Sequence, residues 1–410
     1  MVQAKGSKGR IAWCISPVLS GVTTVYRVVG EGLRRAGWEV LGVTAGAGGA
    51  REFDSQFADQ YCEVLQPESS DLRQCAADFV HWVEERKIDV VFNIGHEFTM
   101  AAAPALPLRV KLVNRCPSIT RFSYQVAVTN LPRTSMVVVE TPRQQRELIR
   151  DWGVPPEKCV VIPGGVELET FTPGAIRDFE GSFRLLYLGR LDDASKGVML
   201  LPQILKRLVE SKVIFHFDII GDGPDRERLR KAFGRYNLLN RMTFHGALPR
   251  PEILPLLQRA HVVLLTSRYE GHSWALLETM ACGCVPVVSR ISGGLDFVVD
   301  HGVSGLLCTV GKSSEFAKAI RDLEGDRNRL RLLCNAAVQT IRERFSLDRV
   351  VRDHDALFET VLAQEPVAYT PVPVSEIQVP NLPGAGWRRF VPQGVKDYAR
   401  TWAERFQRSV

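Results

Sequence analysis

The sequence contains no long hydrophobic run. None approaches the roughly 18 consecutive apolar residues that a membrane-spanning helix needs, so we do not expect an integral membrane protein. The apolar stretch at residues 11–15 follows a basic start, as in a secretion signal, but Pro17 and the Ser20-Gly21 pair end it early. That interruption favours a first buried strand over a signal sequence.

Cysteine is present without a regular framework. The nine cysteines are an odd number scattered from Cys14 to Cys334, and the close pair Cys282 and Cys284 has no metal-type partners near it in the sequence. This pattern is typical of free thiols in a reducing cytoplasm. The formal charge of +6 is mild for 410 residues. It suits an enzyme that handles phosphorylated substrates, even close to an anionic membrane surface, and does not indicate nucleic-acid binding.

The length of 410 residues exceeds what one hydrophobic core usually fills, so two domains are expected. The predicted strands are residues 11–15, 40–43, 90–94, 112–114 and 136–140, followed by 183–188, 215–220, 241–245, 262–266, 285–289 and 305–308. Helical patterns separate most of these strands, and such alternation indicates parallel sheets covered on both faces. The sequence therefore predicts an α/β protein with two doubly wound, Rossmann-like domains that face a cleft.

Turn-rich and proline-rich stretches mark the domain boundaries. The stretch Phe171-Thr172-Pro173-Gly174 suits a hinge, which gives an N-terminal domain at residues 1–173 and a C-terminal domain at 174–364. Residues 365–386 are rich in proline and are predicted to form an extended linker. Residues 387–410 show a basic amphipathic pattern that we expect to dock on the N-terminal domain, with a membrane or partner contact and disorder as alternatives.

Two carboxylates flank a predicted loop-to-helix junction. Glu270 lies in the loop, and Glu278 lies one to two turns inside the helix that follows. Eight helical residues rise roughly 12 Å, so the two carboxylates would contact different parts of one extended ligand. The backbone N–H groups of residues 271–274 would face an anion, while the carboxylates accept hydrogen bonds from hydroxyl groups. A sugar on a nucleotide diphosphate offers both kinds of group, although a solvated acidic pair gives the same pattern.

Two cations follow the predicted strand at residues 183–188. Arg190 and Lys196 each stand beside a glycine, just past the carboxyl end of this strand. Arginine can contact phosphate oxygens through two N–H groups and lysine adds a point charge, so the pair can clamp a diphosphate. A second predicted strand runs into Gly221-Asp222-Gly223-Pro224, where the glycines permit a tight turn. The alternative is an ordinary pair of basic surface residues.

These motifs occur in a characteristic order. They are Gly189-Arg190-Leu191, Lys196-Gly197, Ile220-Gly221-Asp222-Gly223-Pro224, His245-Gly246, residues 267–271, residues 277–283, Gly293-Gly294 and residues 302–307. In this order they resemble the retaining GT-B glycosyltransferases of the glycogen-synthase-like glycosyltransferase family 4 (group 1). The resemblance is specific over about residues 162–307 and weaker over residues 11–35.

The resemblance implies a role for each matching residue. Arg190 and Lys196 match the pair that neutralises the donor diphosphate, and Glu278 matches the residue that binds the ribose hydroxyls. Glu270 matches the residue near the hydroxyls of the transferred sugar, which makes it a candidate catalytic residue. The phosphate-facing turn corresponds to Gly271, His272, Ser273 and Trp274.

The resemblance also assigns the domains and the chemistry. Residues 1–173 would form the acceptor side, where Gly21 matches a turn that approaches the donor phosphates, and residues 174–364 would hold the nucleotide sugar. The family retains anomeric configuration. Cations and a helix N-terminus can stabilise a departing diphosphate without a metal. No Asp-x-Asp motif is placed to hold a divalent ion, and the adjacent Asp192 and Asp193 are interpreted as loop residues.

The match fails at several positions. The family has a histidine after a late strand of the first domain, whereas this sequence reads Asn114-Arg115-Cys116 there. His96, which follows the preceding strand, is the candidate replacement, with Arg115 as a weaker one. Leu295-Asp296-Phe297 replaces the usual acidic ending of a later turn, and His272 stands where an aromatic or aliphatic residue is common. Donor binding stays plausible, and the acceptor chemistry is the part in doubt.

We therefore predict a cytoplasmic glycosyltransferase of the hexosyltransferase type that needs no metal. It would move a sugar from a nucleotide diphosphate sugar to a glycan, lipid or small-molecule acceptor, and residues 387–410 are a candidate peripheral contact with the inner face of the membrane. One alternative is a nucleotide-sugar-binding GT-B protein without transferase activity. Another is a GT-B epimerase or phosphorylase. Neither the base and sugar of the donor nor the acceptor follows from the sequence.

Overall fold

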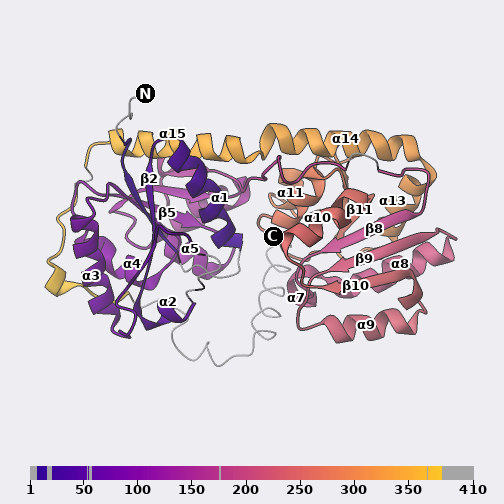
Figure 1. The fold of residues 1–410 in the computed structure, drawn as a ribbon, viewed down its shortest axis with the longest axis horizontal. Coiled ribbons are helices and arrows are strands. Elements are labelled where there is room, and N and C mark those ends of the chain that lie inside the picture. Colours follow the sequence, from indigo (N-terminus) through magenta and orange to yellow (C-terminus); the bar gives the residue numbers. More distant parts are fainter. Residues whose placement is uncertain are drawn as a thin grey trace. The chain divides into compact units, whose positions relative to one another are not determined.

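The computed structural model describes residues 7–15, 21–52, 54, 58–174, 177–366 and 368–380. These residues form two compact units. The first unit comprises the described parts of Met1–Gly164 and Leu347–Arg388, and the second is built on Gly165–Ser346. Each unit is a parallel sheet with helices on both faces (Figure 1), as the sequence predicts. The boundary lies at Gly164, nine residues before the predicted one, and the chain returns to the first unit at Leu347.

The first unit contains a seven-stranded parallel sheet with the order β3-β2-β1-β4-β5-β6-β7. Its strands are β1 Arg10–Cys14, β2 Glu39–Ala45, β3 Cys62–Leu65, β4 Val90–Asn93, β5 Lys111–Cys116, β6 Thr134–Val139 and β7 Cys159–Val161. Its helices are α1 Gly21–Arg35, α2 Gly46–Glu52, α3 Leu72–Glu85, α4 Glu97–Ala102, α5 Arg121–Val128, α6 Pro142–Trp152 and α15 Leu347–Ala363, with short 3-10 turns at Ala103–Ala105, Pro156–Lys158 and Val374–Glu376.

Helix α15 packs on the first unit, although the sequence placed it in the C-terminal domain. Its buried His354 stacks on Trp13 of β1 with ring centroids 6.3 Å apart. The ring of Phe92 in β4 lies 6.0 Å from the His354 ring. A Cβ added at Gly32 of α1 would lie 2.4 Å from Val351, so α1 and α15 are in close contact. The helix therefore covers the sheet face formed by Trp13 and Phe92.

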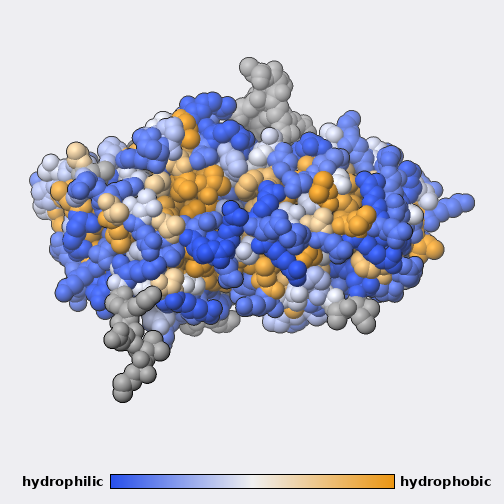
Figure 2. Space-filling view, turned by 90° about the horizontal axis from the view of Figure 1, so that it is seen from above, coloured by the Kyte–Doolittle hydropathy of each residue, from blue (hydrophilic) through white to orange (hydrophobic). Residues whose placement is uncertain are grey.

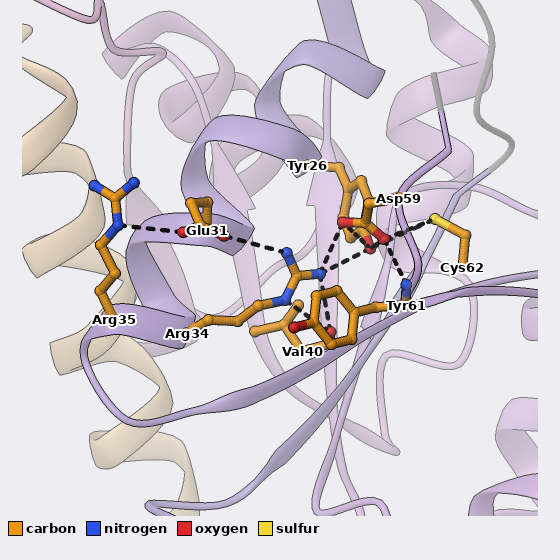
Figure 3. Close-up of polar contacts among 8 residues, drawn as sticks. All are labelled: Tyr26, Glu31, Arg34, Arg35, Val40, Asp59, Tyr61 and Cys62. Carbon is orange, nitrogen blue, oxygen red and sulfur yellow. Dashed lines mark hydrogen bonds and ion pairs between the residues drawn. The ribbon is translucent and has the colours of Figure 1, made fainter. Parts of the chain in front are cut away.

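A cluster of polar side chains joins α1 to β2 and to the segment before β3 (Figure 3). Arg34 donates to the Tyr26 hydroxyl and to the Val40 carbonyl at 3.0 Å each, and its guanidinium lies 3.0 Å from Asp59. The same guanidinium lies over the Tyr61 ring at 4.1 Å. Burial raises the pKa of Tyr26, so its hydroxyl stays protonated and donates to Asp59 at 2.9 Å. This network fixes the outer edge of the sheet.

The described part of the predicted linker packs on the first unit instead of running free. The Val372 N–H donates to the Pro104 carbonyl at 3.0 Å, and Lys111 donates to the Gln364 carbonyl at 2.5 Å. Ile377 is buried in the same hydrophobic cluster as α3 and α4. Ile377, with the partly buried Val372 and Val374, thus joins this proline-rich stretch to the core of the first unit. Residues 381–386 and the basic segment 387–410 lie outside the described residues.

The second unit contains a six-stranded parallel sheet with the order β10-β9-β8-β11-β12-β13. Its strands are β8 Phe183–Leu188, β9 Phe215–Ile220, β10 Met242–Gly246, β11 Val262–Leu265, β12 Val285–Ser289 and β13 Leu306–Cys308. Its helices are α7 Asp193–Lys196, α8 Leu201–Glu210, α9 Arg226–Arg235, α10 Arg250–Arg259, α11 Trp274–Ala281, α12 Leu295–Val298, α13 Ser313–Gly325 and α14 Arg327–Arg344, with 3-10 turns at Val198–Leu200 and Leu239–Arg241.

The long helices bury one face and expose the other. In α14, Leu330, Leu333 and Ile341 are buried, whereas Arg329 and Arg342 are exposed. On the face that Figure 2 shows, apolar residues occur in separate patches among hydrophilic ones. Within the described residues, no helix combines the length and the apolar character that crossing a bilayer requires.

His354 generates a prediction about acid stability. Burial lowers its pKa from the usual 6.5 to about 4, and its Nε2 atom has no hydrogen-bond partner among the described residues. Between pH 6.5 and 4 the imidazole of His354 is protonated in the unfolded chain but stays neutral in the folded chain. The free energy of unfolding is therefore highest above pH 6.5 and decreases as the pH falls toward 4. We expect acidification to lower the free energy of unfolding of His354→Phe by up to about 3 kcal/mol less than that of the unmodified protein.

The measurement is the free energy of unfolding by urea at a series of pH values. The exposed His81→Phe is the matched control and should leave the pH profile unchanged. His96 and His261, whose pKa values burial also lowers to about 4, account for the loss that persists in the variant. An unchanged acid profile for His354→Phe would contradict this account.

Candidate functional site

Two turns at the carboxyl edge of the second sheet pack backbone against backbone. The turn after β8 contains Gly189, and the turn after β9 contains Gly221 and Gly223. A Cβ at Gly221 would lie 1.9 Å from the Gly189 carbonyl oxygen, and one at Gly223 would lie 2.4 Å from the Leu191 carbonyl oxygen. Only glycine permits this approach. The turn that carries Arg190 is therefore held in place by its neighbour.

The short helix α7 places Lys196. Asp192 caps the helix by accepting from the Ala194 N–H at 3.0 Å. At its other end Gly197 has φ 61°, and a Cβ there would lie 2.3 Å from the Thr266 carbonyl oxygen. The Thr266 hydroxyl, just past β11, donates to the carbonyls of Lys196 and Gly197 at 3.1 and 3.0 Å. The end of β11 thus fixes the position of Lys196.

Lys196 and Glu270 form a direct ion pair. The lysine Nζ lies 2.5 Å from Glu270 Oε2, and the Ser267 hydroxyl donates to the same oxygen at 3.2 Å. Arg190 is exposed, and among the described residues none accepts a hydrogen bond from its guanidinium. The buried Tyr187 hydroxyl instead donates to the Arg190 carbonyl at 2.8 Å. The arginine side chain is thus available to a ligand.

The loop-to-helix junction lies where the sequence predicts it. Helix α11 begins at Trp274, and Ser273 is its N-cap, accepting from the Leu276 N–H at 3.4 Å. The first turn of a helix leaves N–H groups without intrahelical acceptors. The loop before it packs tightly, because a Cβ at Gly294 would lie 2.6 Å from the Glu270 carbonyl oxygen. Asp296 folds this second loop by accepting from the Gly293 N–H at 2.6 Å.

These segments enclose a cavity of about 250 Å³. It is lined by Tyr187, Leu188, Gly189, Arg190, Lys196, Leu265, Glu270, His272, Ser273, Trp274 and Ala275. Six predicted site residues therefore meet in one place, namely Arg190, Lys196, Glu270, His272, Ser273 and Trp274. Gly271 lies between two lining residues without lining the cavity itself. Two cations, one carboxylate and a helix N-terminus in one cavity can hold an anion beside a group that carries hydroxyls.

Glu278 is not among the residues that line this cavity. Its carboxylate accepts from Arg250 Nη2 at 2.7 Å, and the same guanidinium contacts Glu167 at 3.1 Å and lies 5.3 Å from the Phe171 ring. Burial raises the pKa of Glu278, and Arg250 opposes the shift. Sequence reasoning missed Arg250, which precedes Glu278 by 28 residues. Its place at the start of α10 gives no sequence signal of the pairing.

Asp192 and Asp193, which the sequence analysis interpreted as loop residues, stabilise α7 and the segments beside it. Asp192 caps α7 and accepts from the Ser195 hydroxyl at 3.1 Å. Asp193 accepts from the Met199 N–H at 2.9 Å and lies 3.4 Å from the Arg268 guanidinium. Both carboxylates therefore have partners within the second unit.

Two predicted site residues belong to the first unit. Gly21 is the first residue of α1. His96 occupies the N-cap position of α4 without a side-chain cap bond, and its ring lies 5.7 Å from Phe98. Desolvation lowers the pKa of the half-buried His96 to about 4, so the ring is neutral at neutral pH. Arg115 is fully buried and donates to Glu140 at 2.5 Å.

Comparison with known families agrees with this architecture. The model of the glycosyl transferases group 1 matches residues 172–340, and the model of glycosyltransferase family 4 matches residues 19–170. Together the two matches span residues 19–340, with a single residue between them. The chain belongs to the family 4-like, group 1 glycosyltransferases, as the sequence resemblance predicts.

Individual relatives match over part of their length. WcaL of Salmonella typhimurium, named for a glycosyltransferase of colanic acid biosynthesis, is 28% identical over 220 residues, or 52% of this chain and 54% of WcaL. A D-inositol 3-phosphate glycosyltransferase of Kribbella flavida is 28% identical over 219 residues, covering 50% of this chain and 51% of the relative. The chain therefore matches about half the length of these relatives.

Solved structures share the fold. The crystal structure of Anabaena HepE in complex with UDP has a TM-score of 0.72 and 20% sequence identity, and the match covers 86% of this chain and 100% of that chain. At this identity the likeness establishes the two-unit Rossmann-like fold, which is the GT-B fold predicted from the sequence.

The cavity predicts how two substitutions affect anion binding. We expect Arg190→Ala or Lys196→Ala to weaken binding of a nucleoside diphosphate by about 1.5–3 kcal/mol, because each removes a charge-assisted hydrogen bond. Isothermal titration calorimetry measures the difference. Lys318→Ala, at a lysine 68% exposed on α13, is the control and should bind as the unmodified protein does. Unchanged affinity in both cavity variants would refute the clamp.

The contact between Arg250 and Glu278 yields a second prediction. Arg250→Gln removes the cation that opposes the raised pKa of Glu278, so that pKa rises further. The ionised carboxylate then disfavours the folded state, and the destabilisation grows as the pH rises through the unfolded pKa. We expect a loss of about 1–2 kcal/mol at neutral pH, discounted for the partial exposure of Arg250.

The test compares urea unfolding of this variant near neutral pH and under mild acid. Arg235→Gln is the control, because this arginine of α9 is exposed and forms no ion pair with the described residues, and its variant should be equally stable at both pH values. A loss that is equal at both pH values would show that Arg250 stabilises the unit without acting on Glu278.

Proposed function

We propose that the protein is a retaining, metal-independent glycosyltransferase of the hexosyltransferase type. It would move a sugar from a nucleotide diphosphate sugar to a glycan, lipid or small-molecule acceptor. The observation that carries this proposal is the cavity of the second unit, where Arg190, Lys196, Glu270 and the start of α11 converge. Family membership and the UDP named in the HepE structure support a nucleotide donor.

The donor diphosphate would bind between the two cations and the start of α11. Arg190 has no competing partner among the residues described, so its guanidinium can contact two phosphate oxygens. Lys196 would exchange its contact with Glu270 for a phosphate oxygen. Ser273 and Trp274 begin a helix whose free N–H groups favour an anion. With the donor bound, these charges would surround the diphosphate and could stabilise its departure.

The two glutamates would hold hydroxyl groups of the donor. Glu270, released from Lys196 by the diphosphate, can accept from hydroxyls of the transferred sugar beside the reacting carbon. Glu278 would accept from the ribose, and Arg250 would keep it ionised and oriented for that contact. Arg250 is thus a positioning residue in this proposal.

Metal independence and the catalytic role of His96 are proposals as well. Asp192 and Asp193 are engaged in capping and in contacts with Ser195, Met199 and Arg268, which supports a site that relies on cationic side chains. His96, neutral because desolvation lowers its pKa to about 4, would act as a hydrogen-bonding group toward the sugar and not as a charged acid. Gly21 would bring backbone N–H groups to the phosphates.

The names of the relatives bear on the acceptor, and the cysteines bear on the location. One relative is named for colanic acid biosynthesis and another for D-inositol 3-phosphate, which supports a glycan or a polar small molecule as acceptor. The scattered free cysteines support a cytoplasmic protein. Residues 387–410 are proposed as a peripheral contact with the inner membrane face. The competing functions are a binding protein without transferase activity and an epimerase or phosphorylase.

One experiment separates these functions. A thermal-shift screen with UDP-, GDP-, ADP- and dTDP-sugars identifies the donor, because a ligand of the native state raises the melting temperature. The donor found is then incubated with mixed glycan, lipid and polyol acceptors, and product is followed by mass spectrometry. We expect sugar transfer, and we expect Glu270→Gln to reduce it by at least about a hundredfold while donor binding persists.

Three outcomes contradict the proposal. Tight donor binding without transfer or hydrolysis, over the whole acceptor set, identifies a binding protein. Conversion of the donor sugar without any acceptor identifies an epimerase, and transfer to inorganic phosphate identifies a phosphorylase. Glu210→Gln, at an exposed glutamate outside the cavity, is the matched control and should transfer normally.

A further inference from the structure

The amino ends of β9 and β10 form a surface that the cavity does not use. The two strands are adjacent and parallel, so their amino ends lie side by side, at the sheet edge opposite the turns that carry Gly221 and Gly246. Helix α9 runs along this part of the second unit (Figure 1). Lys206 lies 5.6 Å from the Tyr236 ring, and Arg241 lies 5.9 Å from the Phe215 ring, which ties the segments together.

We call this surface the basic edge. It consists of Lys206, Lys212, Ile214, Arg230, Lys231, Arg235, Tyr236, Leu239 and Arg241. The stretch from Arg228 to Arg241 contains five cations and no Asp or Glu, compared with a net charge of +6 for all 410 residues. Much of the chain's excess positive charge is therefore concentrated in one short segment.

Several of these cations have no counterion among the residues that the structure describes. Arg226 and Arg228, at the start of α9, pair with Asp222 at 3.0 Å and with Asp225 at 3.2 Å. Farther along the helix, Arg230, Lys231 and Arg235 are exposed and form no ion pair with any residue described. The nearby Glu210 is already paired with Lys206 at 3.1 Å. The end of α9 thus presents uncompensated positive charge to its surroundings.

Apolar side chains stand among these cations. Ile214 is 73% exposed, Leu239 is 43% exposed and Tyr236 is 41% exposed. Single exposed apolar residues are normal on a protein surface, but these three project from the turn before β9 and the segment before β10, which are neighbours. Cations that surround aliphatic and aromatic side chains are typical of proteins that rest on a membrane surface.

We infer that the basic edge binds an anionic lipid surface. Phosphate groups of the lipids would pair with Lys231, Arg235 and the other cations, while Ile214 and Leu239 would enter the boundary of the acyl layer. A phosphate-rich polyanion such as RNA satisfies the cations equally well. It offers no apolar layer for two exposed aliphatic side chains, which favours lipid. The inference concerns a surface of the second unit and holds whether or not the proposed transferase activity is found.

Flotation of the full chain with vesicles tests this inference. Vesicles of phosphatidylcholine with a large fraction of phosphatidylglycerol should bind the protein, and vesicles of phosphatidylcholine alone should not. Lys231→Glu with Arg235→Glu should lower the partition coefficient at least about tenfold, because each cation adds to the attraction. Ile214→Ser with Leu239→Ser should also weaken binding, by several-fold, through lost insertion.

Matched variants on α14 and its surroundings serve as controls. Arg329→Glu with Arg342→Glu changes the net charge by the same amount at two exposed positions, and Val303→Ser with Leu332→Ser removes exposed aliphatic side chains elsewhere in the unit. Both control pairs should bind anionic vesicles as the unmodified protein does. Far-ultraviolet circular dichroism and the melting temperature of every variant show that the fold is kept.

Other outcomes overturn the inference. If the charge-reversal and control pairs behave alike, net charge or residues 387–410 account for any binding, and the basic edge does not. If charge reversal abolishes binding to single-stranded RNA while the serine variants bind vesicles normally, the surface takes a polyanion instead of lipid. Absence of binding to anionic vesicles at low ionic strength also refutes it.

Discussion

Close packing of backbone at the carboxyl edge of the second sheet is the constraint on which the site depends. Gly221, Gly223, Gly197 and Gly294 each stand where a Cβ would lie 2.6 Å or less from a carbonyl oxygen. These contacts lock together the turns that follow β8 and β9 and the loops beside α11. Loops are usually the mobile part of a fold, and here glycine removes the side chains that would hold them apart. That packing positions the backbone of Arg190, Lys196 and Glu270.

The ion pair between Lys196 and Glu270 sets the energetics of this rigid site. A cation in a partly buried cavity costs free energy unless a negative group compensates it, and Glu270 provides that group. In the proposed function, an incoming diphosphate would replace the Glu270 contact of Lys196 instead of neutralising an unpaired charge. Arg190, which has no such partner among the described residues, is then expected to supply more of the net attraction.

Most of this arrangement could be predicted from the sequence because it is local. Strands such as Phe215–Ile220 and the loop-to-helix junction after Glu270 follow from apolar runs and neighbouring residues. Contacts between distant segments could not be predicted in this way. Arg250 meets Glu278 and Glu167 only through folding, and the Leu347–Ala363 helix returns to the first unit although its neighbours in sequence belong to the second. Amphipathic pattern shows that a helix buries one face without showing which core receives it.

Contacts between distant segments also decide which residue could replace the histidine of the family pattern. Arg115 takes the corresponding place in the sequence, yet its side chain is fully buried and its charge is matched by Glu140 at 2.5 Å. If this guanidinium moved toward a sugar, the buried carboxylate of Glu140 would lose its counterion. Breaking a buried ion pair in this way costs about 3–5 kcal/mol. His96 is half-buried, neutral and without a cap bond, so it can form a new hydrogen bond without breaking a charged contact. The contacts of Arg115 therefore support the proposal that His96, and not Arg115, takes the role of the family histidine.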